Sequence, residues 1–153
     1  MADVKPIPDG YPRVTPYLYI DGAADAIDFY TSVLGATERF RLPAPGGKVG
    51  HAELMFGDSV VMVADEAPEM GALSPGTVGG TPMSIMLYVE DVDAVVADAE
   101  RKGAKVLRPV ENKFYGDRGG EILDPFGHQW SLATHVEDVP PDEMERRMGD
   151  LPG

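Results

Sequence analysis

The residues best suited to chemistry are a histidine and a glutamate in a short stretch of β-type sequence. His51 and Glu53 lie two positions apart, so in a strand they share one face. An imidazole and a carboxylate can move protons together or supply two ligands to a metal ion, but a metal site needs three or more converging donors. On an exposed strand such a pair is more often a surface contact. The chain contains no cysteine, which excludes thiolate ligands and a cysteine nucleophile.

A second group with chemical potential lies in a glycine-bearing stretch that is expected to form a loop over 111–120. There Tyr115 could pack on a flat ligand, and Arg118 could hold an anionic group. The alternative is a plain turn followed by a surface pair between Asp117 and Arg118. Trp130 is the only tryptophan, and it suits the core at least as well as a ligand cavity. Neither Gly-x-Ser-x-Gly nor Gly-x-Gly-x-x-Gly before a helix occurs, so a serine hydrolase and a nucleotide loop are not indicated.

The composition of the chain restricts the classes of partner that it is expected to bind. The chain has 153 residues and a formal net charge of -13, which argues against nucleic-acid binding because a phosphate backbone requires clustered Lys and Arg. No apolar run approaches the roughly 18 residues of a membrane helix. The first residues lack the charged and apolar regions of a signal peptide. We therefore expect a cytoplasmic protein whose partners include neither nucleic acid nor a membrane.

The elements that must position these residues occur twice. Residues 84–135 resemble residues 15–63, and both copies close on a Phe-Gly turn before a last strand. The apolar patterns predict strands at 14–20, 37–42, 49–56, 58–64, 83–89, 105–109, 121–123 and 128–134, with one helix after the first strand of each copy. The predicted fold is α+β, with two tandem βαβββ modules and curved sheets around a cleft where the modules meet.

The predicted organisation is one domain over 1–135. Its modules cover 14–64 and 83–135, and the stretch 65–82 between them is a linker or a lid. An acidic tail follows over 136–153, with a short helix expected from the proline pair at 140 to about Met148.

This layout resembles the vicinal oxygen chelate superfamily, which includes glyoxalases, bleomycin-resistance proteins and dioxygenases. The landmarks are Phe29-Tyr30, Leu34-Gly35 and Asp124-Pro-Phe-Gly-His. Val14-Thr-Pro-Tyr-Leu and Phe114-Tyr-Gly-Asp-Arg are similar to the PhnB-like branch. The superfamily hosts many chemistries on one scaffold, so the resemblance implies the fold more strongly than a reaction.

In metal-dependent members the resemblance implies four ligands, one each from the first, fourth, fifth and eighth strands. The matching positions here are Thr15, Met62, Ser84 and Ser131. Hydroxyl and thioether groups are poor ligands for the divalent ions that these enzymes use. We therefore expect no metal cofactor. The alternative is Zn, Ni, Fe or Mn at a displaced site that includes His51 and Glu53.

The same alignment predicts which side chains line the cleft. They bear hydroxyl, aromatic and sulfur groups, which suit a flat and mostly apolar ligand. The predicted ligand-binding residues are Thr15, Tyr17, Tyr19, Met62, Ser84, Met86, Tyr88, Tyr115, Arg118, Trp130 and Ser131.

Three functions are considered. The first is a metal-free protein that binds a small organic molecule, with protection against a toxic compound as its role. The second is a metal-dependent lyase, isomerase or dioxygenase. The third is a metal-free enzyme that uses Tyr19, Tyr88 or Arg118 as an acid or an anchor. The resemblance also implies a homodimer, although relatives with both modules packed in a monomer exist.

Overall fold

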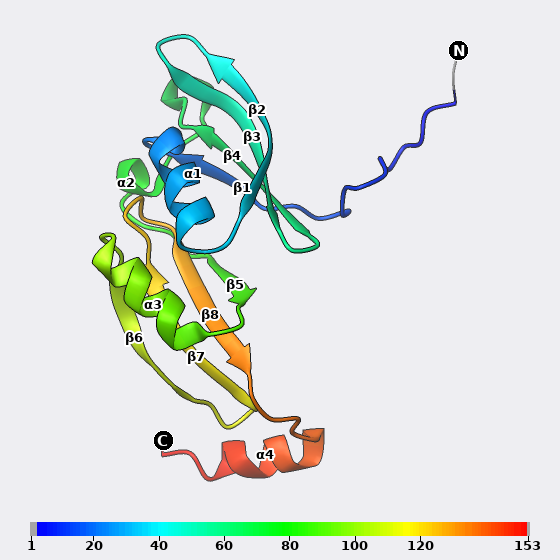
Figure 1. The fold of residues 1–153 in the computed structure, drawn as a ribbon, viewed down its shortest axis with the longest axis vertical. Helices are drawn as coiled ribbons and strands as arrows, with labels where there is room; N and C mark the ends of the chain where they lie inside the picture. The colour runs from blue at the N-terminus through cyan, green and yellow to red at the C-terminus, as the bar shows by residue number, and fades with distance from the viewer. Residues whose placement is uncertain (1–2, 153) are drawn as a thin grey trace. The chain divides into compact units, whose positions relative to one another are not determined.

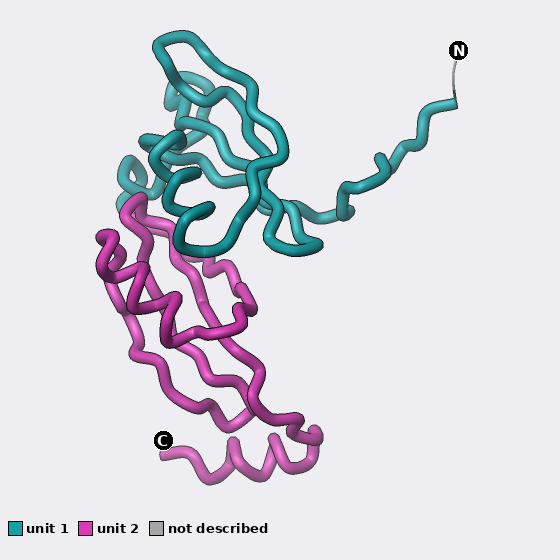
Figure 2. The backbone as a smooth tube through the Cα atoms, viewed as in Figure 1, with its two compact units in different colours: residues 1–79 teal, residues 80–153 magenta. Residues whose placement is uncertain are grey.

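The structure is a computed structural model that describes residues 3–152. The chain divides into two compact units, residues 1–79 and residues 80–153 (Figure 2). Each unit contains one four-stranded sheet and one longer helix against it, and each is described by itself.

Unit one carries its elements in the order expected for a βαβββ module. The sheet order is β1-β4-β3-β2, with β1 parallel to β4 and the other neighbours antiparallel. The elements are β1 (Tyr17–Ile20), α1 (Ala23–Ser32), β2 (Thr37–Ala44), β3 (Lys48–Phe56), β4 (Ser59–Asp65), the 3-10 turn η1 (Pro68–Met70) and α2 (Pro75–Val78) (Figure 1).

Helix α1 covers one face of this sheet because its apolar residues recur at helical spacing. Ala23, Ile27 and Tyr30 are buried on the helix side of the core. The helix begins after Gly22, whose φ of 94° suits a residue without a side chain. The carboxylate of Asp65 accepts the backbone N–H groups of Gly22 at 3.2 Å and Ala23 at 2.9 Å, so the cap comes from the end of β4.

The stretch between the modules is ordered by one glutamate. Glu66 accepts hydrogen bonds from the Thr77 hydroxyl at 2.7 Å and from the Ser74 backbone N–H at 3.1 Å. These bonds hold the single turn of α2, where the sequence pattern had predicted neither helix nor strand.

Unit two repeats the layout with the sheet order β5-β8-β7-β6. Asp91 caps the N-terminus of helix α3, since its side chain accepts the Ala94 N–H at 3.1 Å, and the helix buries Val92, Val96 and Ala99. The elements are β5 (Ser84–Tyr88), α3 (Val92–Arg101), β6 (Lys105–Asn112), β7 (Asp117–Leu123), β8 (Gln129–His135) and α4 (Pro141–Gly149).

Two sequence predictions about element bounds are wrong. The loop expected over 111–120 spans only 113–116, because β6 continues to Asn112 and β7 already begins at Asp117. Gly119 and Gly120 are paired strand residues, opposite Ala133 and Leu132 of β8. The first strand begins at Tyr17, so Thr15 precedes it in the chain.

The α+β prediction is confirmed, with two four-stranded sheets that each carry a helix on one face. In each sheet the residues of the opposite face alternate with the buried ones; Tyr17 and Tyr19 flank buried Leu18, for example. We call this side the open face of each sheet. None of the helices within residues 3–152 is long and apolar enough to span a membrane.

Candidate functional site

The open face of the first sheet carries a cluster of rings. Tyr17 and Tyr19 lie on β1 with their centroids 5.3 Å apart, and the His51 ring on β3 lies 5.5 Å from that of Tyr17. Phe40 on β2 adds an edge contact to His51 at 6.1 Å. Because β4 separates β1 from β3, Tyr17 reaches across Met62, its register partner. Tyr17, Tyr19 and Phe40 remain 39%, 38% and 44% exposed, so a ligand can reach them.

A buried carboxylate organises this cluster. Glu53 is 4% exposed, and its two oxygens accept three hydrogen bonds. Oε1 accepts from the Tyr11 hydroxyl at 2.8 Å and from the Arg39 guanidinium at 3.0 Å, while Oε2 lies 2.9 Å from His51 Nε2. The other ring nitrogen, His51 Nδ1, lies 2.8 Å from the Tyr17 hydroxyl. The result is a continuous chain from Tyr17 through His51 to Glu53.

Charge and burial fix the protonation of this chain. Burial opposes ionisation of Glu53, but hydrogen bonds from His51, Tyr11 and Arg39 outweigh it and hold the pKa of this carboxyl below its ordinary value. An ionised carboxylate only accepts, so His51 Nε2 carries the proton and Nδ1 accepts from Tyr17. Burial, followed by the nearby Tyr19 and Glu53, raises the pKa of Tyr17 and keeps its phenol neutral.

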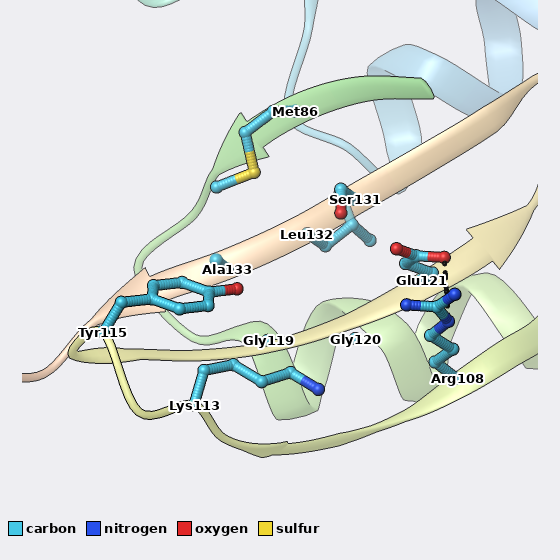
Figure 3. A pocket seen from close by; sticks show the side chains of 10 residues that line it. All are labelled: Met86, Arg108, Lys113, Tyr115, Gly119, Gly120, Glu121, Ser131, Leu132 and Ala133. Atoms are coloured by element: carbon cyan, nitrogen blue, oxygen red, sulfur yellow. Dashed lines mark ion pairs between the residues drawn. The ribbon is translucent and has the colours of Figure 1, made fainter. Parts of the chain in front are cut away.

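The open face of the second sheet carries a pocket of about 200 Å³ (Figure 3). Met86 of β5 and Tyr115 stand at its edges, and backbone from β7 and β8 forms its floor. The residues that line it are Met86, Arg108, Lys113, Tyr115, Gly119, Gly120, Glu121, Ser131, Leu132 and Ala133.

The pocket exists because Gly119 has no side chain. Glu53 pairs with Met62 in the first sheet and Glu121 with Ser131 in the second, so Gly119 occupies the position that His51 has in module one. A Cβ at Gly119 would lie 2.9 Å from the Leu132 carbonyl oxygen, so even alanine would press on backbone.

Two cations stand at the pocket, each near a carboxylate. Arg108 Nε lies 3.6 Å from Glu121, and Lys113 Nζ lies 2.7 Å from Glu111. Lys113 is the more sheltered of the two, because its side chain is 24% exposed against 71% for Arg108. The hollow therefore combines backbone, a thioether and an aromatic ring with two cations that are each paired with a carboxylate.

A second hydrogen-bonded group lies at the far end of β8. Asp117, 4% exposed, accepts from the Tyr88 hydroxyl at 2.7 Å and contacts His135 Nδ1 at 2.8 Å. His135 Nε2 contacts Asp138 at 2.7 Å. The bond to Asp117 raises the pKa of Tyr88, and the bonds to Asp117 and Asp138 raise the pKa of His135.

The structure distributes the predicted site residues over four settings: the open faces of the two sheets, the stretch before β1, and the helix side of the second sheet. The open face of the first sheet carries Tyr17, Tyr19 and Met62, and that of the second carries Ser84, Met86, Tyr88 and Ser131, with Tyr115 at the pocket edge. Thr15 is half-buried before β1.

Two predicted ligand residues lie on the helix side of the second sheet. Trp130 is fully buried, and its Nε1 donates to Asp124 at 2.9 Å, so it is a core residue. Arg118 donates to Asp93 of α3 at 2.8 and 2.9 Å. It alternates with Asp117 along β7 and points to the opposite face, so it is neither a loop anchor nor a pair with Asp117.

The donor chemistry does not fit the metal site of the family. Thr15, Met62, Ser84 and Ser131 offer hydroxyls and a thioether where imidazoles and carboxylates would be required. Among residues 3–152 there is no group of three or more His, Asp or Glu side chains arranged to hold an ion. The polar atoms of His51 and Glu53 are engaged with each other, with tyrosine hydroxyls and with the Arg39 cation, and two residues are fewer than the three ligands that a displaced site would require.

Sequence reasoning missed Tyr11 and Arg39 as partners of Glu53. Tyr11 lies in the extended lead-in, where no periodicity applies, and Arg39 lies where the β2–β3 register shifts between Glu38 and Phe40. A bulge of this kind re-aims a side chain in a way that strict alternation does not predict.

Comparison with known proteins agrees with this architecture. A mycobacterial relative, the uncharacterised protein Mb0911c of Mycobacterium bovis, is 43% identical over 140 residues, which cover 90% of this chain and 92% of that protein. The crystal structure of protein PA1353 from Pseudomonas aeruginosa has a TM-score of 0.67 and 25% identity, and the match covers 82% of this chain and 99% of that one.

A PhnB protein from Bacillus cereus shares the fold, with a TM-score of 0.63 at 20% identity over 80% of this chain and 99% of the other. The family model of the Glyoxalase/Bleomycin resistance protein/Dioxygenase superfamily matches residues 12–132. The tandem βαβββ modules and this match show that the chain belongs to the glyoxalase/bleomycin resistance protein/dioxygenase superfamily.

Proposed function

We propose that the protein binds a small, flat, mostly apolar organic molecule with one acidic group on the open face of its second sheet, without a metal. Protection against a toxic compound is the role that we assign to this binding. The observation that carries the proposal is the pocket floored by Gly119, because the missing side chain leaves a smooth surface between Met86 and Tyr115.

The size of the pocket limits the ligand. Its volume of about 200 Å³ lies below the roughly 300–1,000 Å³ that is usual for drug-sized ligands, so one or two fused rings would fill it. Tyr115 offers a ring face and Met86 a polarisable thioether, and both pack well against aromatic ligands.

The polar groups of the pocket favour one acidic substituent. Lys113 and Arg108 stand at the same hollow, whereas Glu121 is already near Arg108. A carboxylate on the ligand would accept from Lys113 in exchange for part of that lysine's contact with Glu111. The Ser131 hydroxyl supplies a further hydrogen-bonding group.

Calorimetric titration with 2-naphthoate tests the proposal. We expect saturable binding that is unchanged after dialysis against EDTA, and weaker binding to Lys113→Gln and Tyr115→Ala. Lys102→Gln is the matched control, because Lys102 caps the C-terminus of α3 and pairs with Asp98. A Kd that neither pocket variant changes would refute this location. Equal affinity for 2-naphthylmethylamine would refute the acidic group, and loss of binding on EDTA treatment would refute the metal-free site.

We also propose a homodimer, on the strength of the superfamily resemblance. The edge strand β2 supports this idea, since it lies at the edge of its sheet and edge strands readily pair with other chains. Light scattering should report twice the 16.4 kDa mass of the chain. A mass equal to one chain at micromolar concentration would contradict the dimer.

A further inference from the structure

The chain Tyr17–His51–Glu53 has the parts of a proton relay. A phenol contacts one imidazole nitrogen at 2.8 Å, and the other nitrogen lies 2.9 Å from a carboxylate that is almost fully buried. In general acid–base sites a third group fixes the tautomer and orientation of the imidazole in this way. In module two Gly119 replaces the imidazole, so module one alone carries the relay.

The direction of proton movement follows from the hydrogen-bond inventory. Ionised Glu53 accepts from His51 Nε2–H, which leaves the Nδ1 lone pair directed at the Tyr17 hydroxyl. When Tyr17 gives up its proton to Nδ1, the new imidazolium already has Glu53 beside it. The phenol is neutral at rest, so Tyr17 can accept a proton only while it passes its own proton to His51.

We propose that Tyr17, His51 and Glu53 form a metal-free general-base site that removes a proton from carbon in a flat, ring-bearing substrate. The substrate C–H proton moves to the Tyr17 oxygen as the phenolic proton moves to His51 Nδ1. The C–H electron pair stays in the substrate, where it forms a new π bond or expels a leaving group. The imidazolium then returns its proton to Tyr17, and water takes the excess proton.

The surroundings of the relay define the substrate class. Tyr19 and Phe40 flank the relay and offer ring faces, and both are open to solvent. The charged and titratable groups that face the relay are Tyr11 from the lead-in, Tyr19 from β1, Arg39 from β2 and Glu53 itself from β3. Arg39 donates to Glu53 at 3.0 Å and lies 4.5 Å over the Tyr11 ring, so its charge is engaged by the carboxylate and by that ring. The negative charge that develops when the C–H proton leaves must therefore be delocalised within the substrate itself.

The probe that matches these requirements is 5-nitrobenzisoxazole, a flat fused ring whose C3–H proton is removed by a base as the N–O bond opens to a coloured phenolate. The protein should accelerate this opening over buffer. Tyr17→Phe should lower kcat/KM by roughly 10²-fold, the lower end of what a positioned proton-transfer group contributes. Glu53→Gln should lower kcat with little change in KM, since glutamine presents an N–H to Nε2 and reverses the tautomer.

The outcomes separate the relay from other sources of rate. His135→Gln is the control: it removes an imidazole that also contacts a carboxylate but lies in unit two, and it should leave the rate unchanged. Retained or raised activity in Tyr17→Phe would show that His51 acts directly and would overturn the relay. No acceleration by the wild-type protein would also overturn it. Circular dichroism verifies that each variant is folded. If another variant unfolds, Tyr17→Phe, which removes a single oxygen atom, still tests the relay. The relay shares no residue with the pocket over Gly119, so the naphthoate titration and this assay fail independently.

Discussion

Replacing Glu53 by glutamine tests whether this carboxylate holds module one together. The substitution keeps the shape of the side chain and removes its charge. Three hydrogen bonds at 2.8, 3.0 and 2.9 Å then lose their charged acceptor. A bond to a charged group contributes about 1 kcal/mol more than a neutral one, so the upper bound is about 3 kcal/mol. Arg39 and His51 are 29% and 23% exposed, and water can partly replace Glu53 as their partner. We expect a loss of about 2 kcal/mol.

The assay is urea unfolding followed by circular dichroism, with Glu121→Gln as the matched control. Glu121 occupies the same register position in module two, but its nearest cation, on the largely exposed Arg108, lies 3.6 Å away. Its loss should cost about 0.5 kcal/mol or less, as for other exposed pairs. Equal losses in the two variants would refute the role assigned to Glu53.

The pH dependence of this difference provides an independent check. The pKa of Glu53 is lowered from its ordinary value of 4.5 in the folded protein. A group with a lowered pKa stabilises the fold above its unfolded value, and that contribution disappears as pH falls through the folded value. The stability gap between wild type and Glu53→Gln should be full above about pH 5.5 and should shrink in more acidic solution. A gap that is constant from pH 7 to pH 3 would contradict an ionised Glu53.

Two further predictions concern unit two. Gly116→Ala should release the segment that leads to α4, because Gly116 has φ of 102° and an added Cβ would fall on the Glu137 carbonyl oxygen. Trypsin should then cleave at Arg147 faster than in the control Gly149→Ala, where an added Cβ meets nothing within 4 Å. Equal cleavage in the two variants would count against the contact between Gly116 and Glu137. His135→Gln should destabilise the protein most below pH 6.5 and progressively less as pH rises, because the pKa of His135 is raised in the fold and its stabilisation is lost above the folded value. Thermal melts from pH 5 to pH 9 measure this, and a difference that grows with pH would contradict it.

Sequence periodicity predicted the double module because helix and strand periods are local properties. The apolar spacing in α1 and α3 and the glycines that end both helices can be identified without tertiary information. The pairing of His51 with Glu53 on one face also follows from alternation alone, and the two side chains do contact each other.

The parts that sequence did not predict depend on contacts between distant segments. Tyr17 on β1 contacts His51 on β3 because the sheet order brings these two strands to either side of β4. The sequence pattern alone does not specify that order. Gly119 and Gly120 suggested a loop because glycine is depleted in strands. The structure shows them inside β7, where an added Cβ would approach backbone oxygens at 2.9 Å. The loop assignment then misplaced Arg118, since strand geometry turns it toward α3.

A crystal structure of the protein soaked with 2-naphthoate tests the binding proposal most directly. We predict that the fused rings lie flat over Gly119, with Met86 and Tyr115 at their edges and the carboxylate within hydrogen-bonding distance of Lys113. Ring density at another position, while the surface over Gly119 stays empty at saturating ligand, would contradict the proposal.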